Sequence, residues 1–313
     1  MRRVAGPSPL ALPSLRAARR AALPVPRRLR RLPSLWLGTG LLAAVVGLAL
    51  LAGPLTRYDP ARTGAPPLLP PSAAHPLGTD DLGRDLWSNV AFGARASLAV
   101  GVGATALATA VGVAVGAAAG LHGGWWDEVL MRTAEFVQVI PRLLVALLLV
   151  ALFGGDLLTL VVIIALTGWP MTARLVRGEV LALRERDFTL AARALGASGW
   201  RLLRRHLLPN AFPAVLVSLP IQVGRAILIE SGLTFLGLGD PGVPSWGKVM
   251  QSAQAYMREA WWLAVFPGMA LTVTVLALSL VAEGLHALMT PTLARQHASI
   301  PRGGGHRPAD APA

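Results

Sequence analysis

The chain alternates between long apolar runs and short polar or basic segments. Six of the runs approach the roughly 20 residues that an α-helix needs to cross the hydrocarbon core of a bilayer. The six predicted spans are residues 35–53, 96–120, 137–153, 157–173, a stretch within 211–238, and 261–281. Only residues 154–156 separate the third span from the fourth, which predicts a tight helical hairpin. The pattern therefore predicts an all-α polytopic membrane protein with six transmembrane helices.

Small residues, prolines and tryptophans within these runs indicate how the spans pack and where they bend. Gly112, Gly116 and Gly120 recur at every fourth position on one face of the second span. Such a face lets two helices approach closely in a membrane, although an alanine- and glycine-rich helix also produces this spacing by chance. Trp261 and Trp262 stand where an aromatic belt is expected. A kink or a helix end is expected at each of Pro141, Pro170, Pro220 and Pro267.

The composition agrees with a membrane protein and excludes several kinds of chemistry. Of the 313 residues, 54% are hydrophobic and only 14% are charged, whereas a soluble domain of this size exposes more charge. The chain has no cysteine, which excludes disulfides, thiolate catalysis and cysteine metal sites. It also lacks the phosphate-binding pattern G-x-x-x-x-G-K-[ST], so it does not bind ATP by that route.

Arginines gather in two segments and set the expected orientation in the membrane. Residues 1–33 carry nine arginines and no acid, and residues 174–210 carry eight arginines. Because basic loops tend to remain in the cytoplasm, both termini and the 174–210 loop are predicted to be cytoplasmic. A cleavable signal peptide is the alternative for the N-terminal region. The 19-residue apolar run and the lack of a small-residue cleavage site after it favour an uncleaved first span.

These features divide the chain into four parts. A disordered basic cytoplasmic tail is expected over residues 1–33, and the first transmembrane helix with an extracytoplasmic loop over 34–95. A transmembrane domain that contains the cytoplasmic loop 174–210 is expected over 96–290. A second disordered cytoplasmic tail is expected over 291–313.

The stretch DFTLAARALGASGWRLLRRHLLPN, residues 187–210, has the pattern of two short helices joined by a turn. One apolar stripe at helical spacing is formed by Phe188, Ala191, Ala192 and Leu195. Gly196 follows this stripe and suits a helix end that needs a positive φ. Ser198 can cap a second helix, which Pro209 is expected to end. The apolar face of that second helix comprises Trp200, Leu203 and Leu207.

Three roles are open for this helix-turn-helix. It could be an interfacial amphipathic element whose arginines meet anionic lipid. It could be a DNA-binding motif, or a docking element for another subunit. Its position between two membrane spans disfavours DNA binding, so no nucleic-acid partner is expected.

The same stretch matches a known sequence pattern. The "EAA" loop of importer-type ABC permeases reads E-A-A, three residues, Gly and, further on, Leu-Pro. The match lies at Ala191, Ala192, Gly196, Leu208 and Pro209. Leu190 stands in place of the glutamate, and His206 in place of an isoleucine. The change at Leu190 removes any polar contact that the glutamate would make.

Four further segments extend the resemblance over about residues 35–295. They read HPLGTDDLGRDLWSNVAFGARASLAVG (75–101), GGWWDEVLMR (123–132), ESGLTFLGLG (230–239) and PSWGKVM (244–250). Together with RDFTLAARALGAS (186–198), these segments resemble the second-permease branch of the dipeptide, oligopeptide and nickel importer family.

The resemblance implies a type I ABC importer permease fold and a chain that forms half of a transmembrane pathway. It implies import of a small polar solute, above all di- or oligopeptides, driven by ATP hydrolysis in partner ATP-binding subunits. A second permease subunit and an extracytoplasmic solute-binding protein are the other implied partners. The chain would lie in the lipid of the cell's inner membrane as a multi-pass protein, without enzymatic activity or a cofactor of its own.

The resemblance also assigns a role to the 187–210 stretch, namely docking of the ATPase. The expected ATPase-coupling residues are Phe188, Ala191, Ala192, Leu195, Gly196, Trp200, Leu208 and Pro209. The main alternative for the whole chain is an ion-coupled transporter or channel that acts without an ATPase. A purely structural membrane scaffold is a second alternative.

Two ionisable residues within the fifth predicted span are candidates for the transport pathway. Arg225 and Glu230 are five positions apart and therefore do not share one helical face. Charge inside a bilayer is costly and often functional. Arg225 could line the pathway and meet a substrate carboxylate. Alternatively, Arg225 reaches the interface or pairs with another helix, and Glu230 lies near the outer interface.

Charged residues outside the spans are interpreted as structural. Potential metal ligands cluster at His75, Asp80, Asp81 and Asp85. No second ligand cluster accompanies them, so a structured loop in which Asp80 or Asp81 caps a helix is favoured and no metal is expected. Glu128 and Arg132, at positions i and i+4, are expected to pair with each other.

Overall fold

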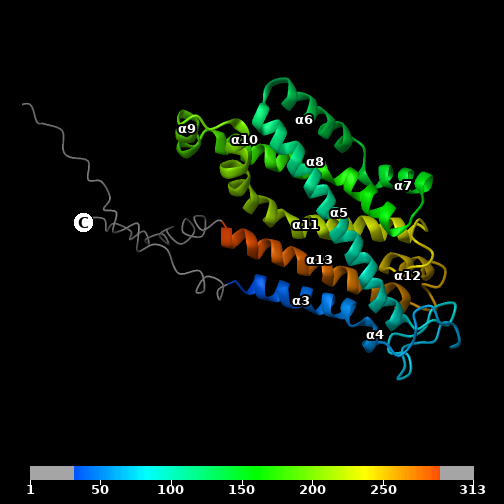
Figure 1. Ribbon diagram of the computed structural model, residues 1–313. Coiled ribbons are helices and arrows are strands. Elements are labelled where there is room, and N and C mark those ends of the chain that lie inside the picture. The colour runs from blue at the N-terminus through cyan, green and yellow to red at the C-terminus, as the bar shows by residue number, and fades with distance from the viewer. Residues whose placement is uncertain (1–31, 290–313) are drawn as a thin grey trace, which may run out of the picture. The chain divides into compact units, whose positions relative to one another are not determined.

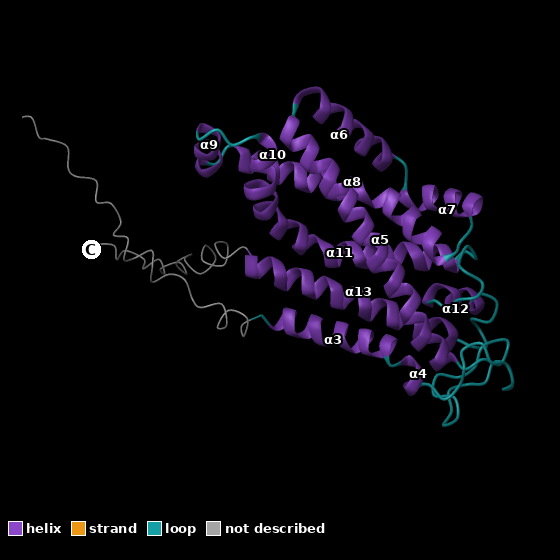
Figure 2. Ribbon diagram, in the orientation of Figure 1, coloured by secondary structure: helices purple, strands orange, loops and turns teal. Residues whose placement is uncertain are grey.

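The computed structural model describes residues 32–289, and these residues form α-helices joined by loops, with no β-strand (Figures 1 and 2). The described helices belong to one compact unit, Ser34–Met289. The predicted tail over 291–313 lies outside the described residues, as does the tail over 1–33 apart from its last two residues. The elements are α3 (Pro33–Leu50), α4 (Ala52–Leu55), α5 (Leu86–His122), α6 (Gly124–Val139), α7 (Arg142–Phe153), α8 (Leu157–Arg184), α9 (Asp187–Ala194), α10 (Gly199–Leu202), the π-helical turn η1 (Leu203–Leu207), α11 (Leu208–Phe235), α12 (Trp246–Ala253) and α13 (Trp262–Met289).

Five of the described helices are long and apolar enough to cross a membrane. They are α3, α5, α8, the continuous helix Gly199–Phe235, and α13. The pair α6 and α7 makes a sixth span if the two are counted together, although they meet at an angle of 84°. The prediction of an all-α polytopic membrane protein is therefore confirmed.

The third predicted span, residues 137–153, is broken at Pro141, where the sequence predicts a kink or a helix end. The chain breaks at Ile140 and Pro141, where Ile140 is extended and α7 starts after the proline. Proline has no N–H to continue the helix, and its ring disfavours helical geometry at the preceding residue. The 12 residues of α7 extend only about 18 Å, too little to cross the bilayer alone. The other predicted proline sites, Pro170, Pro220 and Pro267, all lie inside continuous helices.

Two helices extend well beyond their predicted spans. α5 begins at Leu86 instead of residue 96, and α8 continues to Arg184 instead of ending near residue 173. The 37 residues of α5 correspond to about 55 Å, against a hydrocarbon core of about 30 Å. Hydropathy marks only the part of a helix that contacts lipid, because helical hydrogen bonds persist where the side chains become polar. The predicted hairpin between the third and fourth spans is present, since Asp156 caps α8 directly after α7 ends.

The packing of α5 along α8 is the most extensive helix contact in the unit. A Cβ atom added at Gly112 would lie 2.5 Å from the Cβ of Thr172 and 2.7 Å from the carbonyl oxygen of Trp169. A Cβ at Gly120 would lie 2.8 Å from the Cβ of Val180. The predicted glycine face is therefore a true contact surface, at which the two backbones approach more closely than side chains would allow.

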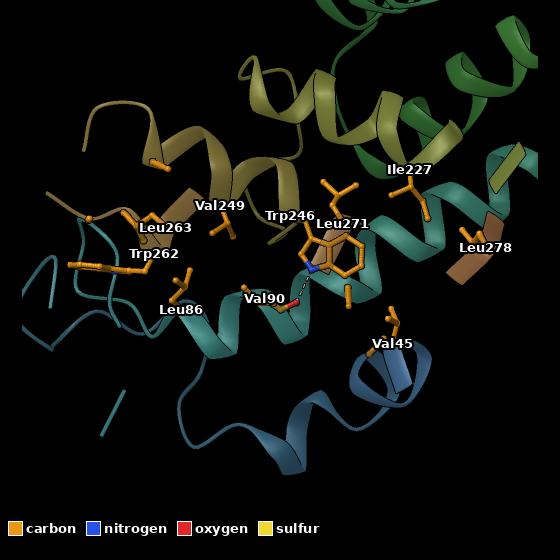
Figure 3. Packing of buried hydrophobic residues seen from close by; sticks show 14 residues of the cluster. Val45, Leu86, Val90, Ile227, Trp246, Val249, Trp262, Leu263, Leu271 and Leu278 are labelled. Carbon is orange, nitrogen blue, oxygen red and sulfur yellow. Dashed lines mark hydrogen bonds between the residues drawn. The ribbon is translucent and has the colours of Figure 1, made fainter. Parts of the chain in front are cut away.

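A buried cluster around Trp246 joins α12 to α5 and α13 (Figure 3). The indole Nε1 of Trp246 donates to the carbonyl oxygen of Val90 at 3.0 Å. Trp262 is also buried, and its Nε1 donates to the carbonyl oxygen of Thr79 at 3.3 Å. Trp262 therefore anchors the loop before α5 and does not belong to an aromatic belt, whereas its neighbour Trp261 is exposed.

Candidate functional site

The stretch 187–210 begins with a helical hairpin, formed by α9 and α10 and the turn between them. It lies at the end of the unit opposite to α12 (Figure 1). α9 ends at Ala194 with Leu195 as its C-cap residue, and Gly196 follows with φ +82°. The N–H of Gly196 donates to the carbonyl oxygen of Arg193 at 3.0 Å, and the N–H of Ala197 to that of Ala192 at 3.1 Å. This pair of bonds is a Schellman motif, so Gly196 occupies the expected turn position.

The second half of the hairpin differs from the prediction at its end. Ser198 caps α10 as expected, with its Oγ accepting from the N–H of Arg201 at 3.4 Å. Pro209, however, does not end this helix. The chain passes through η1 into α11 without a break, and the N–H of Leu208 donates five residues back to Leu203. The wider π-helical turn accommodates the proline at the start of α11, where its missing N–H and its ring are tolerated.

The tip of the hairpin is apolar and exposed. Leu195 is 89% exposed as a residue and Trp200 is 67% exposed. Phe188 and Ala191 of the predicted stripe are also exposed, whereas Ala192 is half-buried, so most of the stripe faces away from the rest of the described chain. Leu190, outside the stripe, is exposed as well. Burial of a leucine or tryptophan side chain stabilises by about 1.5–3 kcal/mol or more, so a cluster of this kind favours a partner surface.

The base of the hairpin is fixed to the membrane spans. Leu203 and Leu207 are buried against Val176 and Val180 of α8, which confirms two of the three residues of the predicted apolar face. Trp200, the third, is exposed instead. The Oγ1 of Thr189 donates to the carbonyl oxygen of Leu183 at 2.8 Å and ties α9 to the end of α8.

Charged contacts secure the same end of α8. The Nε and Nη2 of Arg177 donate to the two carboxylate oxygens of Asp127 on α6, at 2.5 and 2.6 Å. Sequence reasoning missed this pair, because the two residues are 50 positions apart. The expected pair of Glu128 with Arg132 is wrong, since Arg132 pairs with Glu135 at 3.4 Å, where both side chains are exposed. On an exposed surface the i,i+3 and i,i+4 partners are energetically similar, so the spacing alone could not decide between them.

Glu230 lies inside the unit, enclosed by hydroxyl groups. Its residue exposure is 1%. The Oγ of Ser97 on α5 donates to its Oε2 at 3.0 Å, and that of Ser231 at 3.2 Å. The Oγ1 of Thr234 lies 3.5 Å from the other carboxylate oxygen of Glu230, Oε1. The hydrogen bond from Ser97 joins α5 to α11 at this carboxylate.

Arg225 has the opposite environment from Glu230. Its side chain is exposed and its Nη1 donates to the sulfur of Met171 on α8 at 2.9 Å. Ile221 and Leu228, one turn away on either side, are exposed as well. A charged group on the open face of a membrane helix is expected to meet water or protein instead of lipid. The face of α11 that carries Arg225 is therefore expected to contact water or protein as well as lipid.

The loop before α5 is a hydrogen-bonded structure. Asp85, and neither Asp80 nor Asp81, caps α5, accepting from the N–H and Oγ of Ser88 at 2.9 and 2.7 Å. The Nδ1 of His75 lies 2.9 Å from the other oxygen of Asp85. Asp80 accepts from two backbone N–H groups of the loop, while burial raises the pKa of its carboxyl. Within residues 32–289, no group of three or more acidic, histidine or cysteine side chains could hold a metal ion.

Comparison with known proteins identifies the family. The family model of the binding-protein-dependent transport system inner membrane component matches residues 112–295, from the middle of α5 to beyond α13. The chain belongs to this family. It is 35% identical over 261 residues to the oligopeptide transport system permease protein OppC of Bacillus subtilis, covering 82% of this chain and 85% of that protein. It is 38% identical over 229 residues to the dipeptide transport system permease protein DppC of the same organism, covering 72% of each chain.

A third relative, the glutathione transport system permease protein GsiD of Pectobacterium atrosepticum, is 38% identical over 224 residues, 71% of this chain and 74% of that protein. The protein is thus a multi-pass permease subunit of an ABC transporter. Transport permeases of this family are not themselves enzymes, and the family implies ATP-binding subunits and a substrate-binding protein as partners. The helical hairpin lies wholly within the matched region.

Proposed function

We propose that this permease imports di- or oligopeptides and forms half of the transmembrane pathway beside a second, different permease subunit. The relatives support peptides as the solute, since they are oligopeptide, dipeptide and glutathione permeases. The observation that carries the proposal is the exposed apolar hairpin in the family region, a surface without a partner in the described chain.

The hairpin is the proposed docking element for an ATP-binding subunit. The residues that form or shape this surface are Phe188, Ala191, Ala192, Leu195, Gly196, Trp200, Leu208 and Pro209. α8 leads into the hairpin through two residues, and α10 leads out of it into α11 without a break. A displacement of the hairpin by an ATPase would therefore move two membrane helices as rigid bodies and change access to the pathway.

The proposed orientation places the hairpin and both termini in the cytoplasm of the cell, and the chain in its inner membrane. The arginines of the 174–210 loop support this orientation. In this arrangement the loop before α5 and α12 face the extracytoplasmic side, where a binding protein would deliver the solute. The four-part division of the chain stays as predicted, except that the transmembrane domain begins with α5 at Leu86.

The two ionisable residues of α11 take different proposed roles. Arg225 lines the pathway, because its charged side chain lies on an open face. Glu230 holds α5 and α11 together through its hydroxyl partners, and its role in the pathway is limited to keeping that helix in place.

Reconstitution tests the proposed function. The permease is combined with ATP-binding subunits, a second permease and a binding protein of the same transporter family from the same organism, and incorporated into liposomes. We expect accumulation of a labelled dipeptide that requires both ATP and the binding protein. Accumulation driven by an ion gradient without ATP, or no association with the ATP-binding subunits, would contradict the proposal.

A further inference from the structure

Two arginines from different helices meet at one small cavity between the membrane spans. Arg142, the first residue of α7, and Arg225 of α11 both line this cavity. They are close enough for the charge of Arg225 to act on Arg142. Two guanidinium groups repel each other, and the repulsion is stronger in a membrane than in water. The pair is therefore an electrostatic site that favours an anion.

Neither arginine has an acidic partner within residues 32–289. The ion pairs in that part of the chain are His75–Asp85, Arg132–Glu135 and Arg177–Asp127. The Nε of Arg142 is buried and makes no hydrogen bond to any described residue. Arg225 donates to the sulfur of Met171, which is a weak acceptor. Both side chains thus retain donors for a stronger ligand.

The walls of the cavity are arranged to hold these donors in place. A Cβ atom at Gly168 of α8 would lie only 3.0 Å from the Nη2 of Arg142, so this glycine makes room for the guanidinium group. Gln222 lines the same cavity and is fixed by Thr172 and Ser218, each at 3.0 Å. α7 begins at Arg142, and the dipole of this helix favours negative charge at its N-terminal end.

We propose that Arg142 and Arg225 together bind the carboxylate of a transported peptide as it crosses the membrane. This inference rests on the proposed function and names the chemical group that the pathway recognises. The cavity measures about 20 Å³, room for a water-sized group only, so the carboxylate approaches from the open face beside Arg225. There Arg225 exchanges its contact with the thioether of Met171 for a charge-assisted hydrogen bond to the carboxylate, which is stronger.

A carboxylate of the second permease subunit is the competing source of the anion. Such a partner would occupy the site permanently and hold the two subunits together. Transport instead needs a ligand that arrives and leaves, and the weak contact with Met171 leaves Arg225 available for it. The two sources differ in a measurable way, because only the transported carboxylate changes when the peptide is amidated.

The test compares two peptides in the reconstituted complex. ATP-driven uptake of dialanine and of dialanine amide is measured, each at a concentration that saturates the binding protein. The variants are Arg142→Gln, Arg225→Gln and Arg225→Lys, and the matched control is Arg132→Gln, at an exposed arginine of α6. Because the same binding protein serves every variant, a change in the ratio of the two rates belongs to the permease.

We expect Arg142→Gln and Arg225→Gln to lower dialanine uptake about tenfold or more and to leave amide uptake unchanged. Arg225→Lys should retain part of the preference for the free carboxylate, and the control should retain all of it. An equal loss for both peptides, or loss of the second permease on purification, would assign the arginines to a subunit contact and overturn the inference. Unchanged rates would also overturn it. If the wild-type complex imported neither peptide, the proposed function itself would fail, and this inference with it.

Discussion

Gly196 shows how one backbone angle determines the form of the hairpin. Nothing lies within 4 Å of a Cβ atom added at this glycine, so space does not limit the residue there. The backbone angle limits the residue instead. Its φ of +82° lies in the left-handed region, where a residue with a side chain is destabilised by about 1 kcal/mol or more. Asparagine tolerates a positive φ better than other residues, whereas aspartate also adds negative charge beside Arg193 and Arg201.

Gly196→Asp should leave the membrane content of the permease unchanged, since it alters no span. It should reduce co-purified ATPase and ATP-driven uptake, because the turn and the charge of the docking surface both change. Gly196→Asn should have a smaller effect. Gly178→Ala serves as the control, as that glycine has no positive φ and nothing within 4 Å of an added Cβ atom. Normal ATPase binding and uptake by Gly196→Asp would remove Gly196 from the coupling element.

Glu230 allows a second prediction at this scale. Replacement by leucine leaves the hydroxyl of Ser97 without its buried acceptor, and a buried polar group that loses its partner costs about 1–3 kcal/mol. Glu230→Leu should therefore lower the thermal unfolding temperature of the detergent-solubilised permease. Glu230→Gln should lower it less, because its amide oxygen can still accept. Glu283→Leu, at an exposed glutamate of α13, is the control. Equal unfolding temperatures for Glu230→Leu and the wild type would show that the cluster does not stabilise the α5–α11 contact.

The contact of α5 with α8 depends on the absence of side chains. A Cβ atom at Gly116 would collide with the backbone of Ala173, which cannot move without shifting α8 as a whole. Gly116→Leu should therefore reduce the amount of folded permease in the membrane by displacing α8, and with it the hairpin. Gly103→Ala, on the same helix, is the matched control, because its Cβ would meet Val161 at an ordinary 3.4 Å. Membrane content and protease resistance measure the difference, and equal values for the two variants would contradict the packing argument.

Local sequence pattern predicted the elements better than the connections between them. Hydropathy located the spans, and the Leu195–Gly196 and Ser198 signals located the turn and the cap of the hairpin. Pro141 predicted the break between α6 and α7, but the apolar run continues through this proline, so hydropathy alone did not show that the two helices meet at 84°. The course of η1 was missed because a proline at the start of a helix and a proline after its end look alike in a sequence.

The candidate sites needed long-range information that no local pattern contains. Glu230 and its partner Ser97 are 133 positions apart, so the sequence alone could not distinguish an enclosed carboxylate from one in the pathway. Arg142 and Arg225 belong to different helices, and only the structure shows that both line one cavity. The hairpin, in contrast, is formed by residues close in sequence, and its turn could therefore be predicted correctly.

At the scale of the whole molecule, the two ends of the unit differ in a way that fits two different partners. The hairpin end carries exposed apolar side chains and the arginines of the 174–210 loop. The opposite end carries α12 and the loop before α5, where Asp59, Asp81, Lys248 and Gln251 line a cavity of about 850 Å³. An apolar and basic surface suits a permanently bound subunit, and a polar one suits a binding protein that dissociates in each cycle.

This division of the two ends predicts the topology, which a pair of reporter fusions can test. A reporter that is active only outside the cytoplasm should be silent when fused after Gly196, because basic loops such as 174–210 tend to remain in the cytoplasm. The same reporter should be active when fused after Ala65, a half-buried residue between exposed neighbours in the loop that joins α4 to α5. A cytoplasmic reporter at the two positions should give the reverse pattern and controls for expression. Activity of the extracytoplasmic reporter at Gly196 would place the hairpin beyond the reach of ATP and of any ATP-binding subunit. It would overturn both the orientation and the proposed role of the hairpin, while the helical packing of α5 with α8 would stand.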